Sequence, residues 1–321
     1  MNYFVLAFYQ LAPLEDPKGE VAVQKAFLNG KDARARIYVS EEGINGQMSL
    51  AKKDAESYIE WMHSRKEFST IPFKVQEWPE QAFPKLTIKY RKQLVAFDRK
   101  VDLSKKGKPI SAADFKQTLS DQVPHVLLDV RNDYEWAVGH FEGARLPPCG
   151  TFREFHGWTE ALKQEIDPKT TPVLLYCTGG IRCEFYSALL IEEGFQNVRQ
   201  LDGGVIQYGL SEGSQHWKGK LFVFDDRLTV PVSEEETPVI GTCHHCKCSS
   251  DAYYNCANMD CNELFLCCKT CLEAFCGCCS PSCQAAPRLR PYEQQNAHKP
   301  FRKRHHYFAT TFLYKTRQDR A

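Results

Sequence analysis

A cysteine stands where an apolar run of the sequence gives way to a loop with two glycines. The run PVLLYC ends at Cys177 and TGGIR follows, so four residues separate Cys177 from Arg182. Glycines allow consecutive backbone N–H groups to turn inward around an anion, and the arginine and the N-terminus of a following helix add positive potential. Each effect stabilises a thiolate, and a lowered pKa makes a cysteine reactive. We therefore predict that Cys177 is a reactive cysteine and that the positive charge of Arg182 stabilises its thiolate.

The backbone of this loop, formed by Thr178, Gly179, Gly180 and Ile181, limits the size of the group that it can enclose. Cysteine phosphatases use a loop one residue longer because they enclose a tetrahedral phosphate, whereas the shorter ring suits a single sulfur atom. A cysteine at the end of a strand is otherwise a common core residue, but the glycines and the arginine that follow favour a reactive group. We therefore expect sulfur-centred chemistry rather than phosphate chemistry.

Three neighbouring residues each have two interpretations. Cys183 follows Arg182 directly, and its thiol could resolve a modified Cys177 into a disulfide or could point into the core from the first turn of a helix. Asp129 and Arg131 end another apolar run. They could support the loop and bind substrate, or they could form a structural ion pair. The sequence leaves both interpretations open for all three residues.

An alternation of apolar runs and helical patterns predicts the fold that positions these residues. Between about residues 110 and 217, strand-like runs at 125–130, 172–177 and 197–201 alternate with helical patterns at 111–120, 152–166 and 183–194. Such alternation predicts a parallel sheet flanked by helices. Cys177 would then lie at the carboxyl end of a buried strand, where open α/β sheets bind their ligands.

The N-terminal part of the chain has a different order of elements. Strands are expected at 3–11, 35–40, 44–50 and 71–78, and helices at 17–30 and 51–64. This βαββαβ order predicts a ferredoxin-like plait. Residues 85–98 are expected to add one or two strands, in which Lys85, Lys89, Arg91 and Lys92 form a basic face suited to phosphates. A polar, lysine-rich linker follows at 99–109.

A cysteine-rich segment follows these two units. Of the 15 cysteines, 12 lie between Cys243 and Cys283. The N-terminus does not read as a secretory signal, and no apolar run approaches the roughly 20 residues of a membrane span. We therefore expect a cytoplasmic protein with no membrane partner. In the reducing cytosol, such a density of cysteines favours metal binding over disulfides.

The spacing within this segment predicts the metal. Pairs separated by two to four residues can reach one ion from a single turn, and four such pairs supply eight ligands, enough for two tetrahedral structural zinc sites. No run matches the ferredoxin spacings of iron–sulfur proteins, whereas disulfides in an oxidised protein stay an alternative. The predicted ligands are Cys243, Cys246, Cys256, Cys261, Cys268, Cys271, Cys279 and Cys283.

The C-terminal residues are strongly basic although the whole chain carries a net charge of only +1. From Arg288 onward the chain has nine basic residues but only two acidic residues, Glu293 and Asp319, and aromatic residues lie among them. This composition is typical of a nucleic-acid contact and equally of a solvated tail.

Three motifs in sequence order resemble the rhodanese family over roughly 110 residues. The stretch LLDVRNDYEWAVGHFEGA at 127–144 carries the family's pattern of Asp129, Arg131 and Glu135, YCTGGIRC carries the loop cysteine, and LDGGVIQYG at 201–209 matches the closing signature. The resemblance implies a rhodanese fold in which Cys177 carries a persulfide during sulfur transfer.

The whole chain is similar to the rhodanese-type tRNA uridine hydroxylases. The plait with SEEGINGQMSL, the rhodanese loop with YCTGGIRCE and the segment NCANMDCNELFLCCKTC occur in that order. The resemblance implies hydroxylation of tRNA at C5 of uridine 34, with molecular oxygen as co-substrate and Cys177 essential. Phe185 departs from the family pattern, in which a basic residue is expected. No GxGxxG motif for a flavin or nicotinamide cofactor follows a strand.

These inferences define four regions and three candidate functions. We expect a ferredoxin-like, acylphosphatase-like domain at 1–98, a rhodanese domain at 108–220, a zinc-binding segment at 240–285 and a basic tail at 286–321. The first candidate function is the tRNA uridine hydroxylase, and the second is a sulfurtransferase that carries a persulfide on Cys177. The third is a zinc-dependent RNA-binding protein with an inactive rhodanese domain, which the intact Cys177 and Arg182 disfavour.

Overall fold

Residues 3–94 contain the predicted ferredoxin-like plait. The computed structural model describes residues 3–290 and divides the chain into two units, of which the first holds residues up to 136, 141–217 and 232–236. The plait consists of β1 (Tyr3–Leu11), α1 (Pro17–Leu28), β2 (Arg34–Ser40), β3 (Gly43–Ala51), α2 (Lys52–His63), β4 (Phe73–Trp78) and β5 (Leu86–Tyr90). Its sheet has the order β4-β1-β3-β2-β5, and β5 runs parallel to β2. Residues 85–98 therefore add a single strand.

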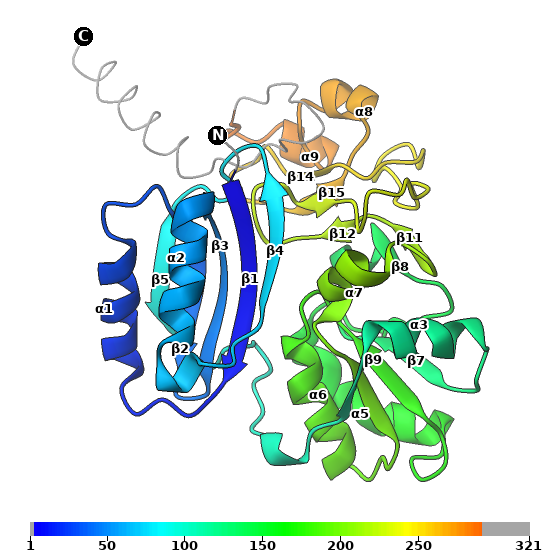
Figure 1. Cartoon of the computed structure of the whole chain (residues 1–321). Coiled ribbons are helices and arrows are strands. Elements are labelled where there is room, and N and C mark those ends of the chain that lie inside the picture. The colour runs from blue at the N-terminus through cyan, green and yellow to red at the C-terminus, as the bar shows by residue number, and fades with distance from the viewer. Residues whose placement is uncertain (1–2, 291–321) are drawn as a thin grey trace. The chain divides into compact units, whose positions relative to one another are not determined.

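Both helices of the plait cover the same face of its sheet, as Figure 1 shows. The core between them contains Leu6, Phe8, Ile37, Ile44 and Met48, all buried. Because side chains alternate across a strand, the residues between these positions lie on the other face. Local sequence sets the helix start, since the Asp16 side chain accepts a hydrogen bond from the N–H of Gly19 and Pro17 occupies the first turn.

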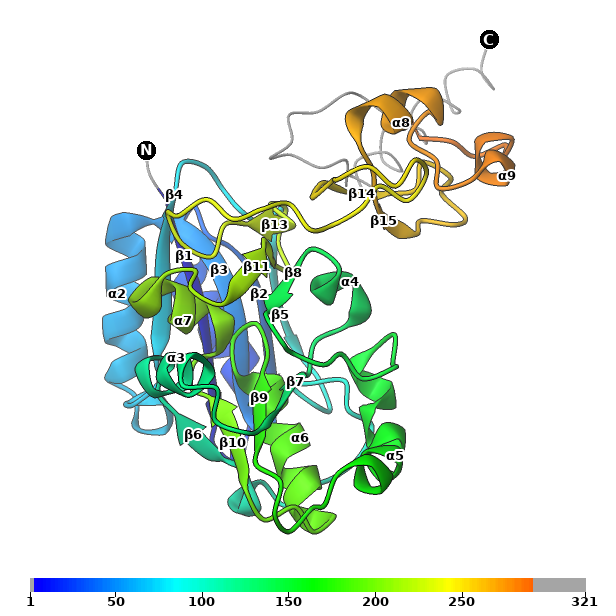
Figure 2. The same ribbon diagram turned by 90° about the vertical axis from the view of Figure 1, so that its right-hand side faces the viewer.

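The rhodanese region forms the predicted parallel sheet. Its strands have the order β6-β10-β9-β7 and pair in parallel. Helices α3 and α7 pack against each other, and so do α5 and α6. Figure 2 shows the two helix pairs on opposite sides of this sheet. The bounds are β6 (Lys108–Ile110), α3 (Ala112–Ser120), β7 (Val126–Asp129), α5 (Phe155–Glu165), β9 (Val173–Tyr176), α6 (Ile181–Glu192), β10 (Val198–Leu201) and α7 (Gly204–Glu212).

Helix α6 begins two residues earlier than the sequence pattern predicts. Gly180, at its N-cap, has a φ of +104°, a conformation that favours glycine. The chain therefore turns sharply after Gly179, and Ile181 and Arg182 belong to the first turn of the helix instead of to the loop. The sequence pattern also gave no sign of the short helix α4 (Asp133–Trp136).

The second unit holds residues 137–140 and 218–231 and continues from 237. Its strands are short: β12 (Leu221–Phe222) pairs with β13 (Thr229–Val230), and β14 (Tyr253–Asn255) pairs with β15 (Leu264–Leu266). The strands β8 (Gly139–Phe141) and β11 (Trp217–Gly219) also pair, and each has one end residue, Phe141 or Trp217, in the first unit. Two short helices follow, α8 (Lys269–Ala274) and α9 (Pro281–Gln284). The predicted basic tail lies outside the described residues from position 291 onward. Within residues 3–290 no helix has the length and apolar composition needed to cross a membrane.

Candidate functional site

The Cys177 side chain lies at the carboxyl end of β9 and is only 1 % exposed. The start of α7 holds the loop that follows, because the N–H groups of Val205 and Ile206 donate to the carbonyls of Cys177 and Thr178 over 3.0 and 3.1 Å. This approach requires a glycine at position 204, since a Cβ there would lie 2.5 Å from the carbonyl oxygen of Cys177. The first turns of α6 and α7 therefore fix the loop from two sides.

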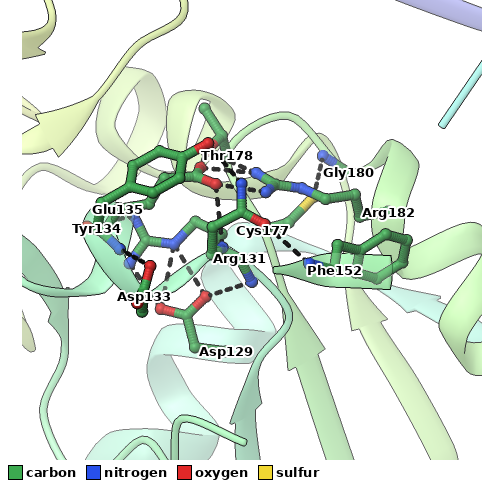
Figure 3. A network of polar contacts seen from close by, with 11 residues as sticks. Asp129, Arg131, Asp133, Tyr134, Glu135, Phe152, Cys177, Thr178, Gly180 and Arg182 are labelled. Atoms are coloured by element: carbon green, nitrogen blue, oxygen red, sulfur yellow. Dashed lines mark hydrogen bonds and ion pairs between the residues drawn. The ribbon is translucent and has the colours of Figure 1, made fainter. Parts of the chain in front are cut away.

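The surroundings of the Cys177 sulfur stabilise its thiolate. Burial by itself would raise the pKa of this thiol, but the S–H group of Cys183, the positive charge of Arg182 and backbone N–H groups lower it to about 5. The Gly180 N–H donates to the sulfur over an N–S distance of 3.1 Å. A dashed line marks this contact in Figure 3. Because this pKa lies below neutral pH, Cys177 is a thiolate under physiological conditions.

Arg182 acts on this thiolate while its guanidinium group is held by Glu135. The two side chains form a bidentate pair with N–O distances of 2.5 and 2.8 Å, and both are buried. Thr178 lies between them in Figure 3, donating to Glu135 over 2.9 Å and accepting from Arg182 over 3.2 Å. Burial opposes the charge on Glu135, yet Arg182 lowers the pKa of this carboxyl group. Glu135 was part of the rhodanese pattern but not of the predicted site.

The charged pair Asp129 and Arg131 is completely buried at the end of β7. The Arg131 guanidinium donates to the Asp129 carboxylate over 2.9 and 2.6 Å, and it lies over the rings of Tyr176 and Trp217 at 5.6 and 5.1 Å. This is the geometry of a structural ion pair. A direct contact of either residue with substrate stays a prediction.

Cys183 lies in the first turn of α6 and is completely buried. Burial and the neighbouring negative charge of Cys177 keep the pKa of the Cys183 thiol well above its ordinary value. Cys183 is therefore a neutral thiol that donates to the Cys177 sulfur. The structure thus brings the two cysteines together, whereas a resolving role for Cys183 stays a prediction.

Two residues of the plait also reach the reactive loop, and sequence reasoning missed both. The Lys74 ammonium group, on β4, donates to the carbonyl of Gly179 over 3.0 Å. The Tyr9 hydroxyl, on β1, donates to Glu184 of α6 over 3.0 Å. A side chain at position 180 would meet this hydroxyl, since a Cβ there would lie 2.9 Å from it.

Lys74 is only 5 % exposed, and within residues 3–290 no carboxylate forms an ion pair with it. Burial lowers the pKa of this ammonium group to about 8, while the negative charges of Cys177 and Asp202 act in the opposite direction. Lys74 therefore places a second positive charge near the reactive loop. No sequence pattern could have found it, because the contact depends on the packing of residues far apart in the chain.

The eight cysteines predicted as metal ligands gather into two groups of four. One group joins the first and third pairs, the other joins the second and fourth pairs, and in each group the sulfur atoms lie within 4.8 Å of one another. The separations of Cys246 from Cys268 and of Cys261 from Cys279 are both 3.7 Å. Four thiolates around one zinc ion, at Zn–S bonds of ~2.3 Å, lie about 3.8 Å apart. Both groups therefore fit a tetrahedral zinc ion.

The remaining cysteines of this segment lie outside both groups. Cys267 and Cys278 are buried, Cys248 and Cys276 are exposed, and no cysteine of the described residues forms a disulfide. His245 contacts the carbonyl oxygen of Cys278 through Nε2.

Three family models match successive parts of the chain. The family model described as UPF0176 acylphosphatase like domain matches residues 3–94, the Rhodanese-like domain model matches residues 111–210, and the Rhodanase C-terminal model matches residues 218–284. Among solved structures, the rhodanese-like domain of an Anabaena protein is 21 % identical, with a TM-score of 0.30, and the match covers 35 % of this chain and 78 % of that one.

Curated relatives match almost the whole chain. A protein of Protochlamydia amoebophila named tRNA uridine(34) hydroxylase is 57 % identical over 307 residues, which cover 96 % of each chain. A protein of Chlamydia muridarum with the same name is 52 % identical over 306 residues, which cover 95 % of this chain and 93 % of the relative. The similarity therefore includes the plait, the reactive loop and the cysteine-rich segment together.

Proposed function

Because the chain belongs to the tRNA uridine(34) hydroxylase family, we propose that it hydroxylates C5 of the uridine at position 34 of tRNA and that the Cys177 thiolate is its reactive group. The observation that carries this proposal is a buried thiolate in the glycine loop of a chain that matches such hydroxylases over nearly its whole length. We further propose that the protein acts in the cytoplasm, where tRNA is available.

The chemistry of uridine explains why such an enzyme needs a thiolate. C5 of uridine is a poor target for direct oxidation. Addition of the Cys177 sulfur to C6 moves the electron pair of the C5–C6 double bond toward C5. C5 then attacks one oxygen of a peroxide that a two-electron reductant has formed from molecular oxygen. The O–O bond breaks as the C5–O bond forms, and the second oxygen leaves as hydroxide, which takes up the C5 proton lost in the next step. Loss of the C5 proton then expels the sulfur and restores both the double bond and the Cys177 thiolate.

The residues around Cys177 have distinct parts in this proposal. The Gly180 N–H and the Cys183 thiol stabilise the thiolate before attack and after release. Arg182 lowers the pKa of Cys177, and Glu135 holds the guanidinium in place. In a second route, Cys177 carries a persulfide or a sulfenate as the intermediate. The Gly180 N–H and the Arg182 guanidinium would stabilise either group.

We propose structural zinc for the two cysteine groups. Thiolates are soft ligands that select zinc, and the sulfur separations fit its tetrahedral geometry. The interleaved pairs join segments whose only regular structure, within the described residues 240–285, is two short strands and two short helices. Bound metal would therefore supply much of the stability of this segment.

Nucleoside mass spectrometry of tRNA separates hydroxylation from the sulfurtransferase alternative. We expect tRNA from cells that lack this gene to have lost 5-hydroxyuridine and its derivatives while its thionucleosides are unchanged, and we expect the wild-type gene to restore the loss. If the hydroxylated nucleosides persist and a thionucleoside disappears, the chain is a sulfurtransferase and the proposal is wrong.

A further inference from the structure

The sheet of the plait has one face that no helix of the plait covers. Strand register places Lys74, Ala7, Gln47 and Arg36 side by side across β4, β1, β3 and β2. A second row, one step along the strands, holds Tyr9, Asn45, Tyr38 and Lys89. Paired residues share a face of a sheet, and the alternating positions Phe8, Ile37 and Met48 are buried under α1 and α2. Both rows therefore lie on the helix-free face of the sheet seen in Figure 1.

This helix-free face is positive. Arg36 and Lys89 are exposed, and within residues 3–290 neither side chain forms a hydrogen bond or an ion pair. Among the residues of the five strands, Glu77 is the one acid, and alternation places it on the helix side with Phe73 and Val75. No strand carboxylate therefore neutralises the two free cations, so the face is suited to phosphate groups.

The same face carries groups that can contact bases. Tyr38 is half-buried, and the Arg91 guanidinium lies 5.0 Å from the centre of its ring. Asn45 and Gln47, both half-buried, add side-chain amides between the strands that bear the cations. Aromatic rings stack on unpaired bases, and amides form hydrogen bonds with base edges. Cations, an aromatic ring and amides on one face of a sheet form a combination that suits single-stranded RNA.

One end of the face meets the reactive loop. Lys74 ends the first row and donates to Gly179 over 3.0 Å, and Tyr9 ends the second row and donates to Glu184 over 3.0 Å. Both acceptors lie within seven residues of Cys177 along the chain. A strand of RNA on this face would therefore extend toward the thiolate.

We propose that the helix-free face of the plait is the surface on which the single-stranded loop of tRNA that contains nucleotide 34 docks. Arg36 and Lys89 contact phosphates, and the Tyr38 ring stacks on a base. The assignment of tRNA as the ligand rests on the proposed function, whereas the assignment of the surface rests on the charge and register of the sheet.

The test measures the affinity of the full chain for a labelled tRNA transcript with uridine at position 34. The variant R36A/K89A removes the two free cations of this face. The control K25A/K53A removes two exposed lysines from α1 and α2, on the opposite side of the sheet, with the same change in charge. For single-stranded nucleic acid, each phosphate contact adds ~0.7 to the steepness with which log K, the logarithm of the binding constant, falls with the logarithm of the salt concentration. The loss of two contacts in R36A/K89A should therefore reduce this steepness by about 1.4, which corresponds to about 25-fold weaker binding at roughly 0.1 M salt. K25A/K53A should bind within about twofold of wild type.

A second pair of variants tests stacking. Y38A should weaken binding by about tenfold, whereas Y38F keeps the ring and should bind like wild type. Thermal melting of each variant checks that the substitutions leave the fold intact. The proposal is overturned if R36A/K89A binds tRNA like wild type, or if K25A/K53A weakens binding as strongly.

These outcomes are separate from those of the proposed function. Binding is measured without hydroxylation, so equal binding by R36A/K89A and wild type contradicts the docking surface even when the enzyme hydroxylates tRNA. Conversely, tRNA that keeps its 5-hydroxyuridine in cells lacking the gene contradicts the proposed function whatever the affinities. If this face binds a protein instead of RNA, R36A/K89A should bind tRNA like wild type, and that result also overturns the proposal.

Discussion

The ammonium group of Lys74 donates a hydrogen bond to the carbonyl of Gly179 over 3.0 Å, although the two residues are 105 positions apart in the chain. Lys74 belongs to the plait, whereas Gly179 belongs to the loop that holds the Cys177 thiolate. The plait therefore contributes a buried cation to a site that the rhodanese region otherwise builds. We therefore predict that the reactivity of Cys177 depends on a residue of the plait.

The first prediction concerns this cation. Removal of a positive charge near a thiolate disfavours the charged form, so K74M should raise the pKa of Cys177 above its value of about 5. The rate of alkylation by iodoacetamide, plotted against pH, should then shift to higher pH, while K74R should largely restore the profile. Trypsin releases Cys177 on the peptide 170–182, separate from Cys183, so that mass spectrometry can follow each thiol.

The control for this experiment is K53M, which changes an exposed lysine of α2 in the same way. K53M should leave the alkylation profile unchanged. A wild-type profile in K74M would show that Lys74 has only a structural role.

The second prediction concerns the thiol of Cys183. Because its S–H group donates to the Cys177 sulfur, C183A should raise the pKa of Cys177, and C183S, which keeps a donor, should change it less. The same alkylation profile measures both variants. If C183A and C183S have identical profiles at the position of wild type, the neighbouring donor does not stabilise the thiolate.

The third prediction concerns the buried pair of Arg182 and Glu135. E135Q keeps the shape of the side chain but leaves the guanidinium charge uncompensated, which costs roughly 3–5 kcal/mol in a buried pair. The free energy of unfolding, measured with urea and tryptophan fluorescence, should fall by about this amount. D133N removes the same charge from an exposed residue two positions away and should change it by at most about 0.5 kcal/mol. Equal stability of the two variants would contradict a structural role for the pair.

The fourth prediction concerns metal content. Anaerobically purified protein should contain two zinc ions per chain, because each cysteine group supplies four ligands. C243S and C256S each remove a ligand from a different group and should each lose zinc, whereas C276S, an exposed cysteine outside both groups, should keep both ions. Less than one zinc per chain in the wild-type protein would refute the assignment.

Much of the fold could be predicted because the spacing of hydrophobic residues within a short segment indicates whether that segment forms a strand or a helix. The plait and the parallel sheet follow from alternation in strands such as 35–40 and from continuous apolar runs such as 172–177. The glycine loop after Cys177 was visible for the same reason, since Gly179 and Gly180 are adjacent to the cysteine that they serve. The cysteine pairs were visible because ligand spacing is a local property.

The rest depends on contacts between distant segments. The contacts of Lys74 and Tyr9 with the loop require the plait to be folded and placed, and no local pattern encodes them. The partner of Arg182 lies 47 residues away, so spacing indicated a cation near Cys177 but not the carboxylate that holds it. Which cysteine pairs share an ion also follows from the fold, because adjacent pairs along the chain join different groups.

The most direct measurement is the 5-hydroxyuridine content at position 34 of tRNA from cells that carry C177S in place of the wild-type gene. C149S is the matched control, because Cys149 is another buried cysteine of the same region and lies outside the reactive loop. We predict that C177S abolishes the modification and that C149S supports it at the level of wild type. Full 5-hydroxyuridine in the C177S strain would contradict the central role of Cys177.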